Sequence, residues 1–386
     1  MRNLPSRTDI DSPSILVHTV ISLVITFMML LIFGNQVMAQ TRLELIHSDV
    51  TRGAISPEGE AIRILEGNVH VRQDTVELWC DRAVFYPASE RVVLTGNVHI
   101  RRGSEELTAQ QVTYYDRLKI AIAKNKVHVR RPKRHLFSEY LKYYYENDQA
   151  YAHTRLKLID QERSAYVTAR EGEYLPEKNL ATVRYQAHFW QVDSSSGDTI
   201  HIYSHKMDYI FHPNRTAIAR DSVKILRGDM VAFCDSAVYL LDDSKAYLEI
   251  HPRAQQRNNT LSGNQMELFF DGMKIQKIII RGNALVTSVA DSLHRKIDKL
   301  SGDEIHAFVV NDKLDRLWAI NHAKSYYHIK QDGKIQGVNQ ASADTIKVFF
   351  KNQEVDYITV IGGTQGIYYP EGYQTRQNEK HDAIKN

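Results

Sequence analysis

The sequence predicts an all-β protein built from repeated, antiparallel strands. The residues Gly-Asn-Val-His followed by Val or Ile and then Arg occur within Glu66–Arg72 and again, 29 residues later, within Thr95–Arg101. A weaker copy, Asn125–Arg130, follows after another 29 residues. Apolar and polar residues alternate in each copy, as in a half-buried strand. The chain also has 21 tyrosines against 3 tryptophans, and tyrosine suits pleated strands. A repeat of this period indicates stacked small units.

Two positions mark each unit of the repeat. The first is the apolar residue that follows the Gly-Asn pair, found at Val69, Val98, Val127, Leu156, Ala187, Val223, Ala254, Ala284 and Ala323, and more weakly at Gln365. The second, further along the unit, is aromatic in the first six units: Phe85, Tyr114, Tyr143, Tyr174, Tyr209 and Tyr239, continued by Leu268, Ala307 and Val348. Polar inserts such as 193–198 account for the longer steps. We therefore expect short connections between neighbouring antiparallel strands.

The aromatic positions share their face with the residues two places earlier, since alternate residues of a strand point the same way. Those residues include Ala83, Val112, Leu141 and Met207. Such a face is either an ordinary core or an apolar trough left partly open for a long ligand. The opposite face carries His70, His99 and His128, each followed two residues later by arginine. That face is either solvated or in contact with phosphate groups, which arginine binds well.

Two local motifs predict where the chain turns. Glycine and asparagine tolerate positive φ, so the Gly-Asn pair predicts a turn just before each strand. An acidic or amide residue recurs at a second kink of the unit, at Asp81, Gln110, Asp235 and Asp303. We interpret these residues as caps of turns rather than as catalytic acids or bases.

The N-terminus resembles an export signal. The segment Ile15–Phe33 is largely apolar and follows basic residues, and Val37 and Ala39 fit the small-residue rule for cleavage. We expect a signal peptide at 1–39 and a mature chain that begins at Gln40. The alternative is an uncleaved anchor, because about 19 apolar residues are just enough to span a bilayer.

Several classes of function find no support in the sequence. It has no nucleophile elbow, zinc-protease motif, phosphate-binding glycine loop or Cys-x-x-Cys, so we expect no enzyme and no cofactor. A net charge of +3 is too small to indicate a nucleic-acid binder. The three histidines would lie about 10 Å apart, too far to share one metal ion. Cys80 and Cys234 fall in distant units, so we expect buried thiols without a disulfide.

The repeat resembles that of a known family. Gly-Asn-Val-x-[Val/Ile], then Leu-x-[Cys/Ala]-[Asp/Gln]-x-[Ala/Val]-x-[Phe/Tyr], is similar to the OstA-type repeat of LptA and of the periplasmic N-terminal part of LptD. The match is best over Leu65–Val129 and continues to about Tyr369. The resemblance implies an elongated, twisted antiparallel β-jellyroll, V-shaped, whose two sheets shield lipid acyl chains. The chain is long enough for three segments, which we place at 40–165, 166–290 and 291–370, followed by a polar tail at 371–386.

The resemblance also implies a function. The chain would be a periplasmic carrier that passes lipopolysaccharide or a similar acylated lipid toward the outer membrane. Its open sheet edges would join other Lpt-pathway jellyrolls, or further copies of the same chain head to tail. The alternatives are a membrane-anchored adaptor resembling LptC and a structural scaffold without a lipid ligand. The expected lipid contacts are Val69, Val71, Ala83, Phe85, Val98, Ile100, Val112, Tyr114, Val127, Val129, Leu141, Tyr143, Tyr174, Met207, Tyr209 and Tyr239.

Overall fold

The computed structural model describes residues 44–371, except 194–196, 273, 292, 294, 295, 312, 332 and 333. These residues form 24 strands and one short 3₁₀ turn, Pro176–Lys178, and include no α-helix. The predicted all-β class is therefore confirmed. Within the same residues, no helix has the length and apolar character needed to cross a membrane.

The strands have the following bounds: β1 (Glu44–His47), β2 (Val50–Ile55), β3 (Ala61–Gln73), β4 (Val76–Tyr86), β5 (Arg91–Arg102), β6 (Glu105–Tyr115), β7 (Ile120–Arg131), β8 (Arg134–Tyr144), β9 (Gln149–Asp160), β10 (Ala165–Leu175), β11 (Leu180–Val192), β12 (Thr199–Ile210), β13 (Thr216–Arg227), β14 (Met230–Leu240), β15 (Lys245–Glu249), β16 (Arg253–Gln256), β17 (Asn259–Ser262), β18 (Gln265–Asp271), β19 (Lys274–Asp291), β20 (Lys296–Val310), β21 (Lys313–Gln331), β22 (Lys334–Lys351), β23 (Glu354–Ile361) and β24 (Gln365–Pro370).

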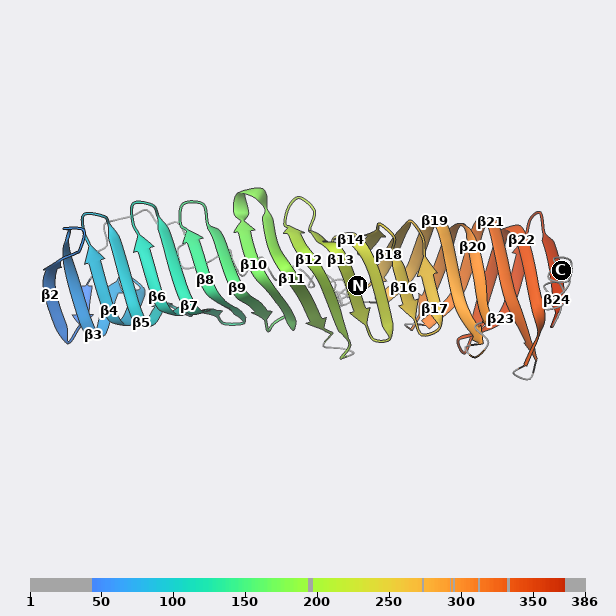
Figure 1. Cartoon of the computed structure of the whole chain (residues 1–386), viewed down its shortest axis with the longest axis horizontal. Helices are drawn as coiled ribbons and strands as arrows, with labels where there is room; N and C mark the ends of the chain where they lie inside the picture. The colour runs from blue at the N-terminus through green and yellow to red at the C-terminus, as the bar shows by residue number, and fades with distance from the viewer. Residues whose placement is uncertain are drawn as a thin grey trace, which may run out of the picture. The chain divides into compact units, whose positions relative to one another are not determined.

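The described chain divides into two compact units, with the boundary inside β14. In the first unit, residues 44–238, strands β3 to β13 pair antiparallel in chain order (Figure 1). In the second unit, residues 239–371, the long strands β19 to β22 pair in the same way. The expected antiparallel neighbours and short connections are therefore confirmed in each unit.

Alternate strands bend at two successive residues of positive φ. In β3 these are Gly67 and Asn68, and the pairing with β4 passes from Glu66–Arg82 directly to Val69–Cys80. Such left-handed pairs recur at Gly96–Asn97, Asn125–Lys126, Thr154–Arg155, Tyr185–Gln186 and Asp221–Ser222 in the first unit, and at Ile250–His251, Gly282–Asn283, Asn321–His322 and Gly362–Gly363 in the second.

The Gly-Asn pair therefore has the predicted backbone conformation but not the predicted place. It lies inside β3 and β5 as a bulge, with hydrogen-bonded ladder on both sides, and not in a turn before a new strand. A bulge adds a residue to one strand and bends it sharply. The prediction of a turn was wrong because the same dihedral angles serve turns and bulges, and only strand pairing distinguishes them.

At two of the kinks, the acidic residues that the sequence predicts to cap turns bind the left-handed pairs of the bulges instead. The Asn97 side chain donates to both carboxylate oxygens of Asp81, at 3.0 and 3.3 Å. In the second unit, His322 Nδ1 lies 2.8 Å from the carboxylate of Asp303. In each case a carboxylate on one strand holds the left-handed pair of the next strand.

The first landmark of the repeat lies in the core at every position except the last. Nine of its ten predicted positions, from Val69 to Ala323, are buried. Gln365 is exposed, at the start of β24. Cys80 and Cys234 are also buried, and no disulfide joins them, as predicted.

Candidate functional site

The predicted lipid contacts lie along the inward faces of the bent strands. Eleven of the sixteen are no more than 4% exposed: Val69, Val71, Ala83, Val98, Val112, Val127, Val129, Leu141, Tyr143, Tyr174 and Tyr209. The other five are half-buried: Phe85, Ile100, Tyr114, Met207 and Tyr239. Fifteen belong to the first unit, and Tyr239 begins the second. The aromatic positions are therefore enclosed in the middle of the first unit and more open at Phe85 and Tyr114.

Two tyrosine hydroxyls of this face, those of Tyr114 and Tyr143, bond to carboxylates in the hairpins. Tyr114 donates to Asp116 at 2.9 Å, and Lys119 donates to the same oxygen at 2.6 Å. Tyr143 donates to Asp148 at 2.5 Å. Burial, together with the hydrogen bond to the neighbouring carboxylate, raises the pKa of both tyrosines. The hydroxyls therefore remain protonated donors at neutral pH, with the apolar part of each ring left for packing.

Two further aromatic residues belong to this face and were not predicted. The ring of Tyr145 packs edge-on against Tyr114 and Tyr143, with centroids 5.7 and 4.8 Å away. Phe211 packs in the same way against Tyr174 and Tyr209, at 5.8 and 5.3 Å. Both follow a predicted tyrosine, Tyr143 or Tyr209, by two residues. Because alternate residues of a strand share a face, the sequence pattern could have identified both residues. Each lies one residue beyond the end of its strand.

The outward face of the first unit carries the histidines and arginines that the sequence placed there. Trp79 stacks between His70 and His99, with ring centroids 4.8 and 5.1 Å apart. Arg101 forms an ion pair with Glu77 at 2.5 Å. A second such pair joins Arg130 and Glu106 at 2.8 Å. These arginines already have carboxylate partners, which argues against a phosphate site on this stripe.

The histidine stack continues on β7 and β8. His128 stacks on Phe137 with centroids 4.2 Å apart, and its Nε2 lies 3.1 Å from Nδ1 of His135. Burial lowers the pKa of His128, and the neighbouring His135 and Arg130 lower it further. This face is thus a packed ladder of rings rather than the loosely solvated face that the alternation predicts.

The inward face is mainly apolar. Its side chains are mostly aliphatic or aromatic, but they include the buried polar residues Arg131, Ser138 and Asp160, and Arg131 forms an ion pair with Glu105 at 3.1 Å. Such a surface stabilises apolar groups through the hydrophobic effect, which has no directional requirement.

Comparison with known proteins gives a family for part of the chain. Residues 40–195 match the family model described as OstA-like protein. That stretch is therefore OstA-like, which confirms the predicted resemblance there. No curated protein matches the chain.

Eleven chains of solved structures also match. One is LptH of Pseudomonas aeruginosa, described as the LptA-homologous periplasmic component of the conserved lipopolysaccharide transport device. It is 18% identical, with a TM-score of 0.28, and the match covers 36% of this chain and 93% of LptH.

Proposed function

We propose that this chain, OstA-like over residues 40–195, is an exported, non-enzymatic carrier of lipopolysaccharide or a similar acylated lipid. The observation that supports the proposal is the inward apolar face of the first unit, which repeats the same residue positions from Val69 to Tyr209. An acyl chain is long and uniform, so a repeated apolar face matches it along its whole length. Each methylene buried there would contribute about 0.8 kcal/mol.

The half-buried residues Phe85 and Tyr114 are the proposed first contacts. Their neighbours Ala83 and Val112 are fully enclosed, so a ligand would reach the aromatic side chains before the aliphatic ones. Entry to the enclosed positions would then require the inward faces to separate locally.

A matched pair of tyrosines tests the proposal. Tyr114 and Tyr115 are consecutive, half-buried, and on opposite faces of β6. A photo-crosslinking amino acid at Tyr114 should capture lipopolysaccharide in cells, and the same amino acid at Tyr115 should not. A second probe at Val98, on the same inward face, should also give adducts. If neither inward probe attaches to lipid, or if Tyr115 captures as much as Tyr114, the carrier function is wrong.

A closed structural array is the second candidate. Tyr143, Tyr174 and Tyr209 are almost fully enclosed, as in an ordinary core. A scaffold of this kind would give no lipid adduct at Tyr114, so the same experiment separates the two. The proposed anchored adaptor depends on residues 1–39, outside the described residues, and mass spectrometry of the mature N-terminus tests it. A chain that begins at Gln40 excludes the anchor.

The proposed partners would dock on the outermost strands. Among the described residues, β1 and β2 each pair only with β3, and they expose Leu45, Val50 and Ile55. Open strand edges bind further strands through their unused backbone groups. We expect Val50→Pro, which removes a backbone N–H and constrains β2, to weaken association with another jellyroll protein or a second copy. Crosslinking between purified proteins measures it.

A further inference from the structure

A row of alternating cations and aromatic rings crosses seven strands of the second unit. Backbone pairing places its members directly opposite one another in the order Lys245 (β15), Phe269 (β18), Lys277 (β19), Phe308 (β20), Arg316 (β21), Phe349 (β22) and Tyr357 (β23). The residues beside them in sequence, such as Leu268, Ile278 and Ala307, are buried in the core. The row, called the cation–aromatic row below, therefore lies on the outward face.

The cations of the row lie over the aromatic rings. The Lys277 ammonium is 5.8 Å from the centre of the Phe269 ring and 5.4 Å from that of Phe308. The Arg316 guanidinium lies 4.6 Å from the centre of Phe308. Beside the row, Lys347 lies 4.7 Å from the ring of Trp318. Contacts of this kind attract a cation without neutralising it, because the ring carries no net charge.

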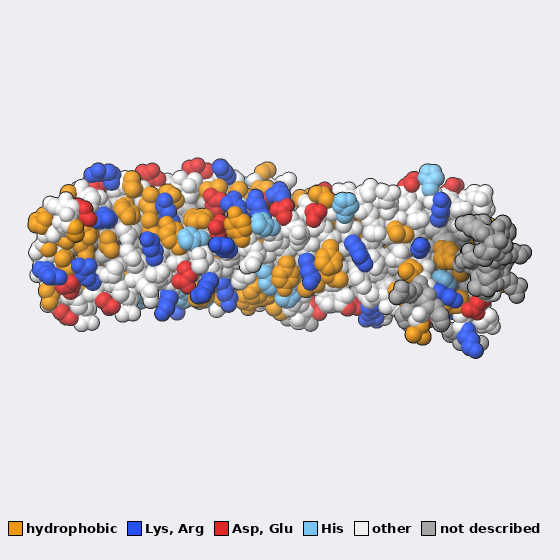
Figure 2. All heavy atoms as spheres, in the orientation of Figure 1, with side chains coloured by type: hydrophobic (Ala, Val, Ile, Leu, Met, Phe, Trp, Pro, Cys, Tyr) orange, Lys and Arg blue, Asp and Glu red, His pale blue; other side chains and the backbone are white. Residues whose placement is uncertain are grey.

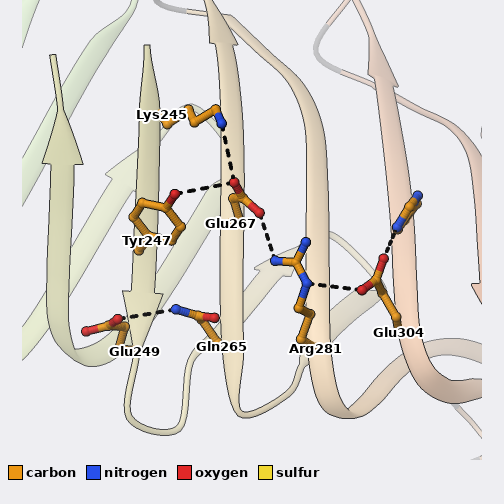
Figure 3. Close-up of polar contacts among 8 residues, drawn as sticks. Lys245, Tyr247, Glu249, Gln265, Glu267, Arg281 and Glu304 are labelled. Carbon is orange, nitrogen blue, oxygen red and sulfur yellow. Dashed lines mark hydrogen bonds and ion pairs between the residues drawn. The ribbon is translucent and has the colours of Figure 1, made fainter. Parts of the chain in front are cut away.

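Two of the three cations of the row already have a carboxylate partner: Lys245 lies 3.7 Å from Glu267, and Arg316 lies 3.1 Å from Asp315. Figure 3 shows Glu267 between Lys245 and Arg281, and Arg281 between Glu267 and Glu304. Arg281 lies 2.7 Å from Glu267 and 3.0 Å from Glu304, and His306 also bonds Glu304. In contrast, neither Lys277 nor Lys347 forms an ion pair with any residue of the described chain. Positive charge without a carboxylate partner therefore remains at Lys277, in the middle of the row, and at Lys347 beside it.

We propose that the cation–aromatic row binds an acidic glycan, a linear saccharide chain that carries phosphate or carboxylate groups. The row is linear, and its cations recur at every second strand, a spacing of about 10 Å. Contact with the rings already restricts the Lys277 side chain, so less side-chain freedom is lost on binding. The ring edges between the cations offer apolar contact to sugar C–H groups. This site lies on the outward face of the second unit and outside residues 40–195.

Other anionic partners fit the row less well. An acidic β-strand places same-face side chains about 7 Å apart, which does not match the spacing of the cations. A flat anionic membrane would also meet Glu249, Glu267 and Glu304, which lie on the same outward face. Single-stranded nucleic acid needs free ring faces for its bases, whereas cations cover the faces of Phe269 and Phe308.

The test uses the full-length protein and defined polymers. Polygalacturonate supplies carboxylates, phosphomannan supplies phosphates, and dextran is the uncharged control. Trp318 reports on binding by fluorescence once Trp79 and Trp190, the other two tryptophans, are replaced by phenylalanine. The variant Lys277→Gln/Lys347→Gln removes two cations. The matched control Lys324→Gln/Lys330→Gln removes two exposed lysines elsewhere on β21.

We expect one or both acidic polymers to bind and dextran not to bind. Lys277→Gln/Lys347→Gln should weaken binding by about ten-fold, and the control pair by less than about two-fold. Far-ultraviolet circular dichroism and thermal melting verify that both variants fold. Equal losses in the two variants, or no binding of either acidic polymer, would overturn the proposal. So would binding to phosphatidylglycerol vesicles in place of the polymers.

Discussion

The bulge in β5 contains Gly96, whose position leaves no room for a side chain. Its φ is +74°, and a Cβ placed there would lie 2.2 Å from Oδ2 and 2.8 Å from Cβ of Asp81. Rotation of the Asp81 side chain would move the oxygen away but not the Cβ, so the backbone of β4 or β5 would have to shift. The rotation would also break the hydrogen bonds from Asn97.

Gly96→Ala should therefore lower the free energy of unfolding by about 2–4 kcal/mol. The left-handed conformation contributes about 1–2 kcal/mol of this loss, and the displaced hydrogen bond about 1 kcal/mol more. Contact with the Asp81 Cβ supplies the remainder. Urea unfolding followed by circular dichroism and tryptophan fluorescence measures the change.

Gly103→Ala is the matched control. Gly103 also has positive φ, +58°, but no atom lies within 4 Å of the added Cβ. It should lose only the conformational part, about 1–2 kcal/mol. If the two substitutions cost the same within about 0.5 kcal/mol, the close approach of Asp81 contributes nothing and the reasoning fails.

Three further predictions concern the core and the titratable groups. Leu136→Ala, at a fully buried site, should cost about 2–5 kcal/mol in urea unfolding, whereas Leu118→Ala, 60% exposed, should cost less than about 0.5 kcal/mol. Burial raises the pKa of the Cys80 thiol from 9.0 to about 11, so the folded state keeps its proton longer than the unfolded state. Stability should then fall as pH rises through this range, less steeply in Cys80→Ala. Burial, His135 and Arg130 lower the pKa of His128, so stability should fall as pH drops below about 6.5, and less so in His128→Phe.

The sequence alone predicted the core positions because the repeat keeps the same residue spacing from one strand pair to the next. Val69 and Ala323 are more than 250 residues apart, yet both occupy the predicted buried position after a left-handed pair. The prediction failed at Gln365, which lies on a terminal strand that pairs only with β22 among the described residues. A strand with a single neighbour buries less of each residue.

Most later units lack the Gly-Asn pair but keep two successive residues of positive φ at the same place. Asn321 and His322 adopt positive φ in place of a Gly-Asn pair, and both residue types are enriched in this conformation among residues other than glycine. The hydrogen bond from His322 to Asp303 stabilises this conformation. Strand pairing therefore imposes the bend, and Gly-Asn is only the sequence that adopts it with the least strain.

The cation–aromatic row could not be predicted because it requires register across seven strands at once. Lys245 and Tyr357 are over 100 residues apart, and the hairpins and breaks between them differ in length. An error of one residue in any pairing moves a side chain to the opposite face. The inward positions can be predicted without the exact register, because their hydrophobicity identifies them. Cations and rings on an outward face cannot be told from ordinary surface residues in the same way.

The two proposed sites are experimentally separable because Tyr114 lies in the first unit and the cation–aromatic row in the second. Within one strand, Arg316 faces outward and Leu317 lies in the core, so a sheet one residue thick separates a polar surface from an apolar one. Lys277→Gln/Lys347→Gln changes no inward side chain and should leave lipid capture at Tyr114 intact. Conversely, a bulky probe at Tyr114 is in the first unit and changes no residue of the row. If one of these variants lost both lipid capture and glycan binding, its substitution would have disturbed folding. That variant would then support neither site.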